Sequence, residues 1–103
     1  MSNSIPLPTK FKLDKKLVKV VFDNKYCQDE GIYGEADFIN GIITLCDRKD
    51  GKKVIRSIIE QTFHHELTHF ILHSFGRNKL KYDEGFVDNF ADRLQEFRQT
   101  VKY

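Results

Sequence analysis

The sequence predicts an α+β fold, in which a small, mainly antiparallel sheet of three or four strands packs on two main helices. Short apolar runs rich in β-branched residues fill the first half of the chain. Two of these runs flank Asn40-Gly41, a dipeptide typical of tight hairpin turns. From about residue 54 the apolar residues recur with the period of a helix instead.

The length of 103 residues indicates a single domain spanning residues 1–103. Apolar residues make up 40% of the chain, which is enough for one compact core. A bound metal would add stability that so small a core needs. Residues 1–10 contain Pro6 and Pro8, which favour extended backbone, and are interpreted as a flexible lead-in.

The charge pattern bears on partners and location. The net charge is +2, and acidic and basic residues are interspersed, so we expect no nucleic-acid partner. No run is long enough to span a membrane, and the N-terminus lacks the pattern of a signal peptide. We therefore expect a cytoplasmic monomer without a membrane partner, in which Cys27 and Cys46 are reduced.

The first half predicts strands separated by polar loops. Leu17–Phe22 predicts a strand. Residues 32–38 and 42–45 predict the two strands of the hairpin around Asn40-Gly41. Residues 23–31, with room for one helical turn, and residues 48–53 are interpreted as polar loops.

The first long helix is predicted over Val54–Phe75, with Gly76 as its C-terminal stop. Steps of 100° per residue sort it into three arcs. The apolar arc holds Ile59, Phe63, Leu67, Phe70 and Ile71. A second arc, which we expect to face water, holds Ser57, Gln61, His64 and Thr68. The arc between them holds His65, Glu66, His69 and His73.

The second helix is predicted over Glu84–Val101, with Asp83 as its N-cap. Glu84, Asp88 and Ala91 form a stripe beside its apolar side. If the apolar faces of the two helices pack together, their polar edges meet. The apolar side comprises Phe86, Val87, Phe90, Leu94, Phe97 and Val101.

The chemistry is carried by His65-Glu66-x-x-His69, the H-E-x-x-H pattern of zinc hydrolases. Residues four apart lie on one face of a helix, so both imidazoles can bind one Zn²⁺. Glu66 would lie beside the metal and act as general base. Glu84 is the predicted third ligand, and Asp88 is placed to accept a hydrogen bond from a ligating histidine.

Alternatives remain at several positions. Asp83 could replace Glu84 as ligand, Glu84 could be an ordinary first-turn carboxylate, and Asp88 could merely face solvent. His73 lies about 12 Å along a straight helix from His65 and is interpreted as a partly buried, hydrogen-bonded neighbour of the site. Tyr33, Tyr82 and His73 are candidate donors to an oxyanion, among which the sequence does not choose.

The motif followed by Glu84-x-x-x-Asp88 resembles the gluzincins, zinc metallopeptidases with a glutamate ligand on a later helix. At this size it looks most like their minimal members, the minigluzincins, and the ImmA/IrrE-type peptidases. The latter resemblance rests on residues 65–73 and on Glu84-x-x-Val87-x-x-Phe90-Ala91, and covers about residues 54–95. The chain departs from that pattern at Val87-Asp88, where Ala-Asn is common.

The resemblance implies that an edge strand above the active-site helix binds an extended peptide. By that likeness the substrate-facing edge would include Gly34, Glu35 and Ala36. The expected function is hydrolysis of protein or peptide by a metallopeptidase, as an endopeptidase with one Zn²⁺ per chain. The alternatives are a latent precursor whose cleft is occupied by residues 1–10 or 98–103, a non-catalytic zinc-binding module, and a deformylase-like amidase that uses Cys46 at the metal.

Overall fold

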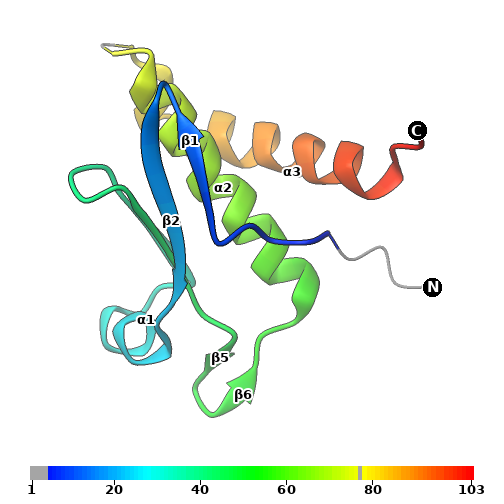
Figure 1. The fold of residues 1–103 in the computed structure, drawn as a ribbon. Helices are drawn as coiled ribbons and strands as arrows, with labels where there is room; N and C mark the ends of the chain where they lie inside the picture. The colour runs from blue at the N-terminus through cyan, green and yellow to red at the C-terminus, as the bar shows by residue number, and fades with distance from the viewer. Residues whose placement is uncertain (1–4, 77) are drawn as a thin grey trace.

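The computed structural model describes residues 5–76 and 78–103 and confirms the α+β fold (Figure 1). A mixed four-stranded sheet and a small two-stranded hairpin precede two long helices. The strands are β1 (Lys10–Leu13), β2 (Lys16–Phe22), β3 (Gly34–Asp37), β4 (Ile42–Leu45), β5 (Arg48–Lys49) and β6 (Lys52–Lys53). The helices are α1 (Asn24–Glu30), α2 (Arg56–Ser74), the 3₁₀ turn η1 (Leu80–Tyr82) and α3 (Glu84–Thr100).

The sheet has the strand order β1-β2-β4-β3. The pairs β1–β2 and β3–β4 are antiparallel, and β2–β4 is parallel, with Val20 opposite Ile43. The sheet is thus mainly antiparallel, as predicted, but mixed. The strand β3 lies at one edge, so one row of its backbone N–H and C=O groups lacks a partner strand.

Helix α2 packs against the sheet, and α3 crosses α2 on its other side (Figure 1). The apolar arc predicted for α2 faces the sheet, and burial of these side chains is the main source of stability. The core comprises Val18, Val20, Ile43, Leu45, Ile59, Phe63 and Phe70.

The water-facing arc predicted for α2 is confirmed at Ser57, which is exposed, but is wrong for His64 and Thr68, which are buried. His64 is 0% exposed and Thr68 is 1% exposed. The Nδ1 of His64 donates to the carbonyl oxygen of Glu60 at 2.6 Å, and Arg98 donates to its Nε2 at 3.0 Å. Burial and the Arg98 charge together lower the pKa of His64. The polar side of α2 thus becomes an interior surface whose hydrogen bonds are made within the protein.

The polar edges of the two long helices meet as expected, at His65, Glu84 and Asp88, but the apolar side of α3 is buried only in part. The buried side chains of α3 are Val87, Ala91 and Gln95. Phe90 is 46% exposed and Phe97 is 57% exposed. The sheet already occupies the apolar arc of α2, so α3 packs through smaller side chains on the opposite side.

The N-terminal segment is more structured than predicted. Residues 1–4 lie outside the described range, but Lys10–Leu13 forms β1. Ile5 is buried, its N–H donates to a Glu60 carboxylate oxygen at 3.0 Å, and Arg56 donates to its carbonyl at 2.6 Å. Residues 5–10 were predicted to belong to a flexible lead-in. The structure instead shows them held by the N-terminal turn of α2 and by the sheet.

Two predicted loops need correction, and the predicted hairpin is confirmed with a first strand shorter than 32–38. The segment 23–31 forms the complete helix α1, because the Asp23 side chain caps it by accepting from the Tyr26 N–H. Residues 48–53 form the β5–β6 hairpin. The β3–β4 hairpin is confirmed, but its turn has four residues, and only Gly41 of residues 38–41 has a positive φ, +68°.

The two long helices begin and end within two residues of the predicted positions. Helix α2 starts at Arg56 rather than Val54, and α3 ends at Thr100 rather than Val101. None of the helices in residues 5–76 and 78–103 combines the length and apolar character needed to cross a bilayer.

Gly34 sets the approach of β3 to α2, and its replacement by alanine should destabilise the fold. An added Cβ would lie 2.5 Å from Thr62 Cγ2 and 3.0 Å from the Thr44 carbonyl oxygen. We expect Gly34→Ala to lower the free energy of unfolding by roughly 1–3 kcal/mol, measured by urea denaturation. Adding Thr62→Ser removes the closest methyl and should recover part of the loss. Equal stability of Gly34→Ala and wild type would contradict this contact.

Glu60 should contribute stability that depends on pH. Burial alone would raise the pKa of Glu60, but hydrogen bonds from Ile5, Arg56 and Gln99 outweigh it and hold the pKa below 4.5. A lowered pKa in the folded state stabilises the protein above the unfolded pKa, and this stability is lost as pH falls through the folded value. We expect Glu60→Gln to cost roughly 1–3 kcal/mol at pH 7 and progressively less below about pH 4.5.

Urea unfolding of wild type and Glu60→Gln between pH 3 and pH 7 measures this difference. Glu96→Gln is a suitable control, because Glu96 is exposed on α3 and makes no ion pair within the described residues. A stability difference that does not change with pH would show that the charge of Glu60 is unimportant.

Candidate metal centre

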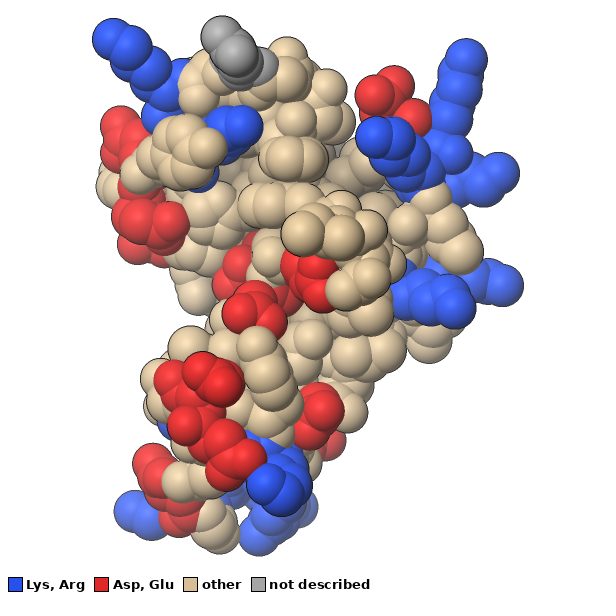
Figure 2. All heavy atoms as spheres, turned by 90° about the vertical axis from the view of Figure 1, so that its left-hand side faces the viewer, with Lys and Arg blue, Asp and Glu red and all other residues tan. Residues whose placement is uncertain are grey.

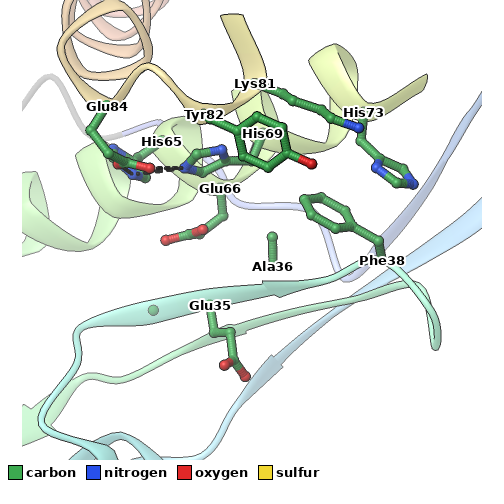
Figure 3. Close-up of a pocket in the computed structure, with 11 residues that line it drawn as sticks. Glu35, Ala36, Phe38, His65, Glu66, His69, His73, Lys81, Tyr82 and Glu84 are labelled. Carbon is green, nitrogen blue, oxygen red and sulfur yellow. Dashed lines mark hydrogen bonds and ion pairs between the residues drawn. The ribbon is translucent and has the colours of Figure 1, made fainter. Parts of the chain in front are cut away.

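Two turns of α2 and the first residue of α3 form one cluster of metal-binding groups (Figure 3). The Nε2 atoms of His65 and His69 lie 3.2 Å apart. One carboxylate oxygen of Glu84, Oε2, lies 3.1 Å from His65 Nε2, and the other, Oε1, lies 3.1 Å from His69 Nε2. These three residues could hold a metal ion.

The position of Glu84 follows from the cap of α3. The Asp83 carboxylate accepts a hydrogen bond from the Phe86 N–H at 3.0 Å, which starts the helix at Glu84. The preceding turn η1 packs against both α2 and α3 and returns the chain to the cluster. Asp83 is therefore engaged as the cap, and Glu84 is the carboxylate that faces the histidines.

The spacing of the three donor atoms fits a zinc ion. Zinc binds imidazole nitrogen and carboxylate oxygen at about 2.0–2.2 Å, usually as a tetrahedron. Donors at the corners of such a tetrahedron are about 3.3–3.4 Å apart. The two histidine nitrogens are 3.2 Å apart, which is close to this value, and one ligand atom from each of the three residues lies within 4.8 Å of the other two. Three protein ligands leave a fourth position open, which is typical of catalytic sites.

Asp88 fixes the orientation of His65. Its Oδ1 lies 2.7 Å from His65 Nδ1, one turn along α3 from Glu84. Because a carboxylate accepts, Nδ1 donates, and the neutral His65 ring presents a lone pair at Nε2. This lone pair faces the Glu84 carboxylate and the Nε2 of His69. The imidazole lone pairs and the Glu84 carboxylate are all acceptors, so they can lie this close only with a proton or a metal cation between them.

Glu66 lies beside the cluster rather than within it (Figure 3). It is 8% exposed, and burial is the main cause that raises its pKa to about 7. Nearby His65 opposes this shift, and Glu84 and Glu35 add to it. A carboxyl group with a pKa near neutrality can both accept and return a proton.

The cluster opens into a pocket of about 530 Å³ between α2, η1 and the edge strand β3. Gly34, Glu35 and Ala36 of β3 border it, as do Tyr82 and His73. Tyr33, the third candidate donor, does not line this pocket, and Lys49 lies over its ring at 4.1 Å. The lining comprises Gly34, Glu35, Ala36, Phe38, His65, Glu66, His69, His73, Lys81, Tyr82 and Glu84.

Glu35 borders the pocket through its backbone, because its side chain points away from His65 and His69 (Figure 3). Its carboxylate accepts a hydrogen bond from the Tyr26 hydroxyl at 2.7 Å. Alternate residues of a strand point to opposite faces, which directs Gly34 and Ala36 toward α2. The edge of β3 thus offers its backbone to the pocket.

His73 differs from its predicted environment. It is exposed at the surface, and its ring stacks parallel to Phe38 with centroids 4.2 Å apart. Cys27 and Cys46 are free and buried, and neither belongs to the metal-binding group. The Sγ of Cys46 lies 3.6 Å from the Tyr33 carbonyl oxygen. The described residues thus give no support to a cysteine ligand at this centre.

Sequence reasoning missed two residues of the pocket, Phe38 and Lys81. Phe38 follows the last residue of β3, and Lys81 lies in η1, within the loop between the two long helices. The sequence held one signal for Lys81: a loop that returns Glu84 to the histidines must pass beside the pocket. No family model, no curated protein and no solved structure matches this chain.

Asp88→Asn should weaken metal binding. An asparagine can still accept from His65 but carries no charge, so it supports the ligating ring less strongly. Loss of such a supporting group typically costs 10–100-fold in metal affinity, and we expect about tenfold here. Competition with a fluorescent zinc chelator measures the change. Asp92→Asn, one turn further along α3, is the matched control, and an equal effect in both variants would contradict the role of Asp88.

Proposed function

We propose that this protein is a zinc-dependent metallopeptidase. The observation that supports this most strongly is the cluster of His65, His69 and Glu84, whose ligand atoms, one from each residue, lie within 4.8 Å of one another. Glu66 lies beside that cluster in the same pocket. The edge strand β3 borders the pocket as well, which suits an extended peptide.

Zinc, when bound, would supply a Lewis acid for the attacking water and the peptide carbonyl. Glu66 takes the proton from that water at its carboxylate and passes it to the nitrogen of the leaving amine. The backbone of β3 holds the peptide by strand addition. Of the candidate donors to the developing oxyanion, Tyr82 borders the pocket, whereas His73 lies at the end that holds Phe38.

A non-catalytic zinc-binding module is the principal alternative. Structural zinc sites usually have four protein ligands, whereas this group has three. Such a module would also have no use for a buried Glu66. For a latent precursor, no residue in 5–10 or 98–103 lines the pocket. Digestion assays on full-length and terminally trimmed protein test that possibility.

The test is hydrolysis of casein, an unstructured substrate, by zinc-loaded protein. We expect cleavage that stops on addition of a strong chelator and returns when zinc is restored. A parallel preparation of Glu66→Gln excludes a contaminating protease. Zinc binding without any cleavage, in both full-length and trimmed protein, would favour the non-catalytic module.

A further inference from the structure

The pocket has a second end, away from the metal-binding group, with a different chemistry. Here Phe38 and His73 stack face to face, and Phe38 also packs edge-on against Phe70 with centroids 5.0 Å apart. Lys81 reaches over this end from η1 (Figure 3). An aromatic wall and an ammonium group therefore lie together at one end of the pocket.

Lys81 is the single Lys or Arg among the described residues that line the pocket, which also include Glu35, Glu66 and Glu84. Its Nζ lies over the Tyr82 ring, 5.2 Å from the centroid. It takes part in none of the ion pairs found in residues 5–76 and 78–103. On the face seen in Figure 2, Asp and Glu lie in the middle and lower parts and near the upper edges, and Lys and Arg lie along the upper and right margins and at the bottom.

We propose that this end of the pocket selects peptides carrying a carboxylate, which pairs with Lys81. The inference rests on the proposed peptidase function and gives the substrate class. The methylene groups of an Asp or Glu side chain would lie against the Phe38–His73 pair, and the carboxylate would reach the ammonium.

The position of this carboxylate along the peptide follows from the helix. His73 lies one turn beyond His69, about 6 Å along the axis. An extended peptide covers this distance in about two residues. The selected residue is therefore one or two positions from the bond that is cut, on the side of Phe38.

Two sources of carboxylate can be separated. An internal Asp or Glu can reach Lys81 whichever way the peptide runs along β3. A C-terminal carboxylate can reach it only if the peptide runs parallel to β3, because Phe38 follows the C-terminal end of that strand. Quenched fluorescent peptides with Glu, Gln or Lys at each position, as free acids and as amides, distinguish these cases.

For wild type we expect Glu-containing peptides to be cut about fivefold faster, in kcat/KM, than their Gln counterparts. Lys81→Glu should remove this preference and favour the Lys peptides instead. Lys79→Glu changes the net charge equally and lies outside the pocket lining, so it should retain the wild-type preference. A preference confined to free-acid peptides would assign the site to the C-terminal carboxylate.

A second readout does not depend on catalysis. Binding of the same peptides to zinc-loaded Glu66→Gln protein, by fluorescence anisotropy, should show the same order and the same reversal in Lys81→Glu. Equal binding and cleavage of Glu and Gln peptides together with equal values for free acids and amides, or a preference unchanged by Lys81→Glu, would overturn the inference and leave the peptidase intact. Peptide binding with the expected charge preference but no cleavage would instead overturn the proposed catalysis and retain the charge preference.

Discussion

Replacement of Glu66 by glutamine is expected to reduce peptide hydrolysis by roughly 10²–10⁴-fold while zinc stays bound. Glutamine keeps the shape of the side chain but cannot accept the proton of the attacking water. The metal-binding group does not include Glu66, so the affinity for zinc should change little. Casein hydrolysis and zinc content, measured on the same preparations, test both parts of this expectation.

The matched control is Glu96→Gln, a surface change on α3 that should leave activity unaltered. Glu66→Gln also relieves the cost of a buried carboxylate, so its stability should equal or exceed that of wild type near pH 7. Full activity in Glu66→Gln would show that another group is the general base.

Replacement of Glu84 by alanine is expected to weaken zinc binding more than roughly a hundredfold, beyond the effect of Asp88→Asn. In wild type, zinc at a hundred times its Kd should add about 2.7 kcal/mol of stability. For a domain of this size that corresponds to a rise in Tm of roughly 10–20 °C. Glu84→Ala should lose most of this rise at the same zinc concentration.

The comparison needs the metal-free proteins as a baseline. The Glu84 side chain is 63% exposed, so its contribution to stability without metal should be small. Glu96→Ala, on the same helix, should show the full wild-type response to zinc. A rise in Tm that is equal in wild type and Glu84→Ala would place the zinc elsewhere.

Part of the site is predictable from the sequence, because its geometry is local. The period of the α-helix places His65 and His69 one turn apart whatever the rest of the fold does. Asp83 is a typical N-cap, so Glu84 falls in the first turn of the next helix. A short connection between two antiparallel helices then returns Glu84 to the vicinity of the histidines. The structure places these groups within 3.2 Å of one another.

The partners of each helical face are not predictable in the same way. His64 and Thr68 look like surface residues because their own helix carries an apolar arc elsewhere. Their burial depends on α3, which begins 20 residues after His64 and 16 residues after Thr68. The partners that satisfy His64 are Glu60 and Arg98, and the latter is 34 residues away. Pairing of this kind is a property of the tertiary fold.

The roles of Phe38 and Lys81 in the pocket are not predictable for the same reason, because they depend on the tertiary fold. In the sequence, one is the residue after a strand and the other is a lysine in a polar loop. They meet because β3 is the edge strand and η1 crosses above it. Their common end of the pocket becomes apparent when the sheet order and the path of the loop are known.

The most direct test of the metal centre is the zinc content of the purified protein after dialysis, determined by elemental analysis. We expect about one zinc per chain in wild type and Glu66→Gln, and close to none in Glu84→Ala and His69→Ala. No zinc in wild type, with none taken up on titration, would contradict the account. Equal zinc in wild type and in both ligand variants would contradict it as well.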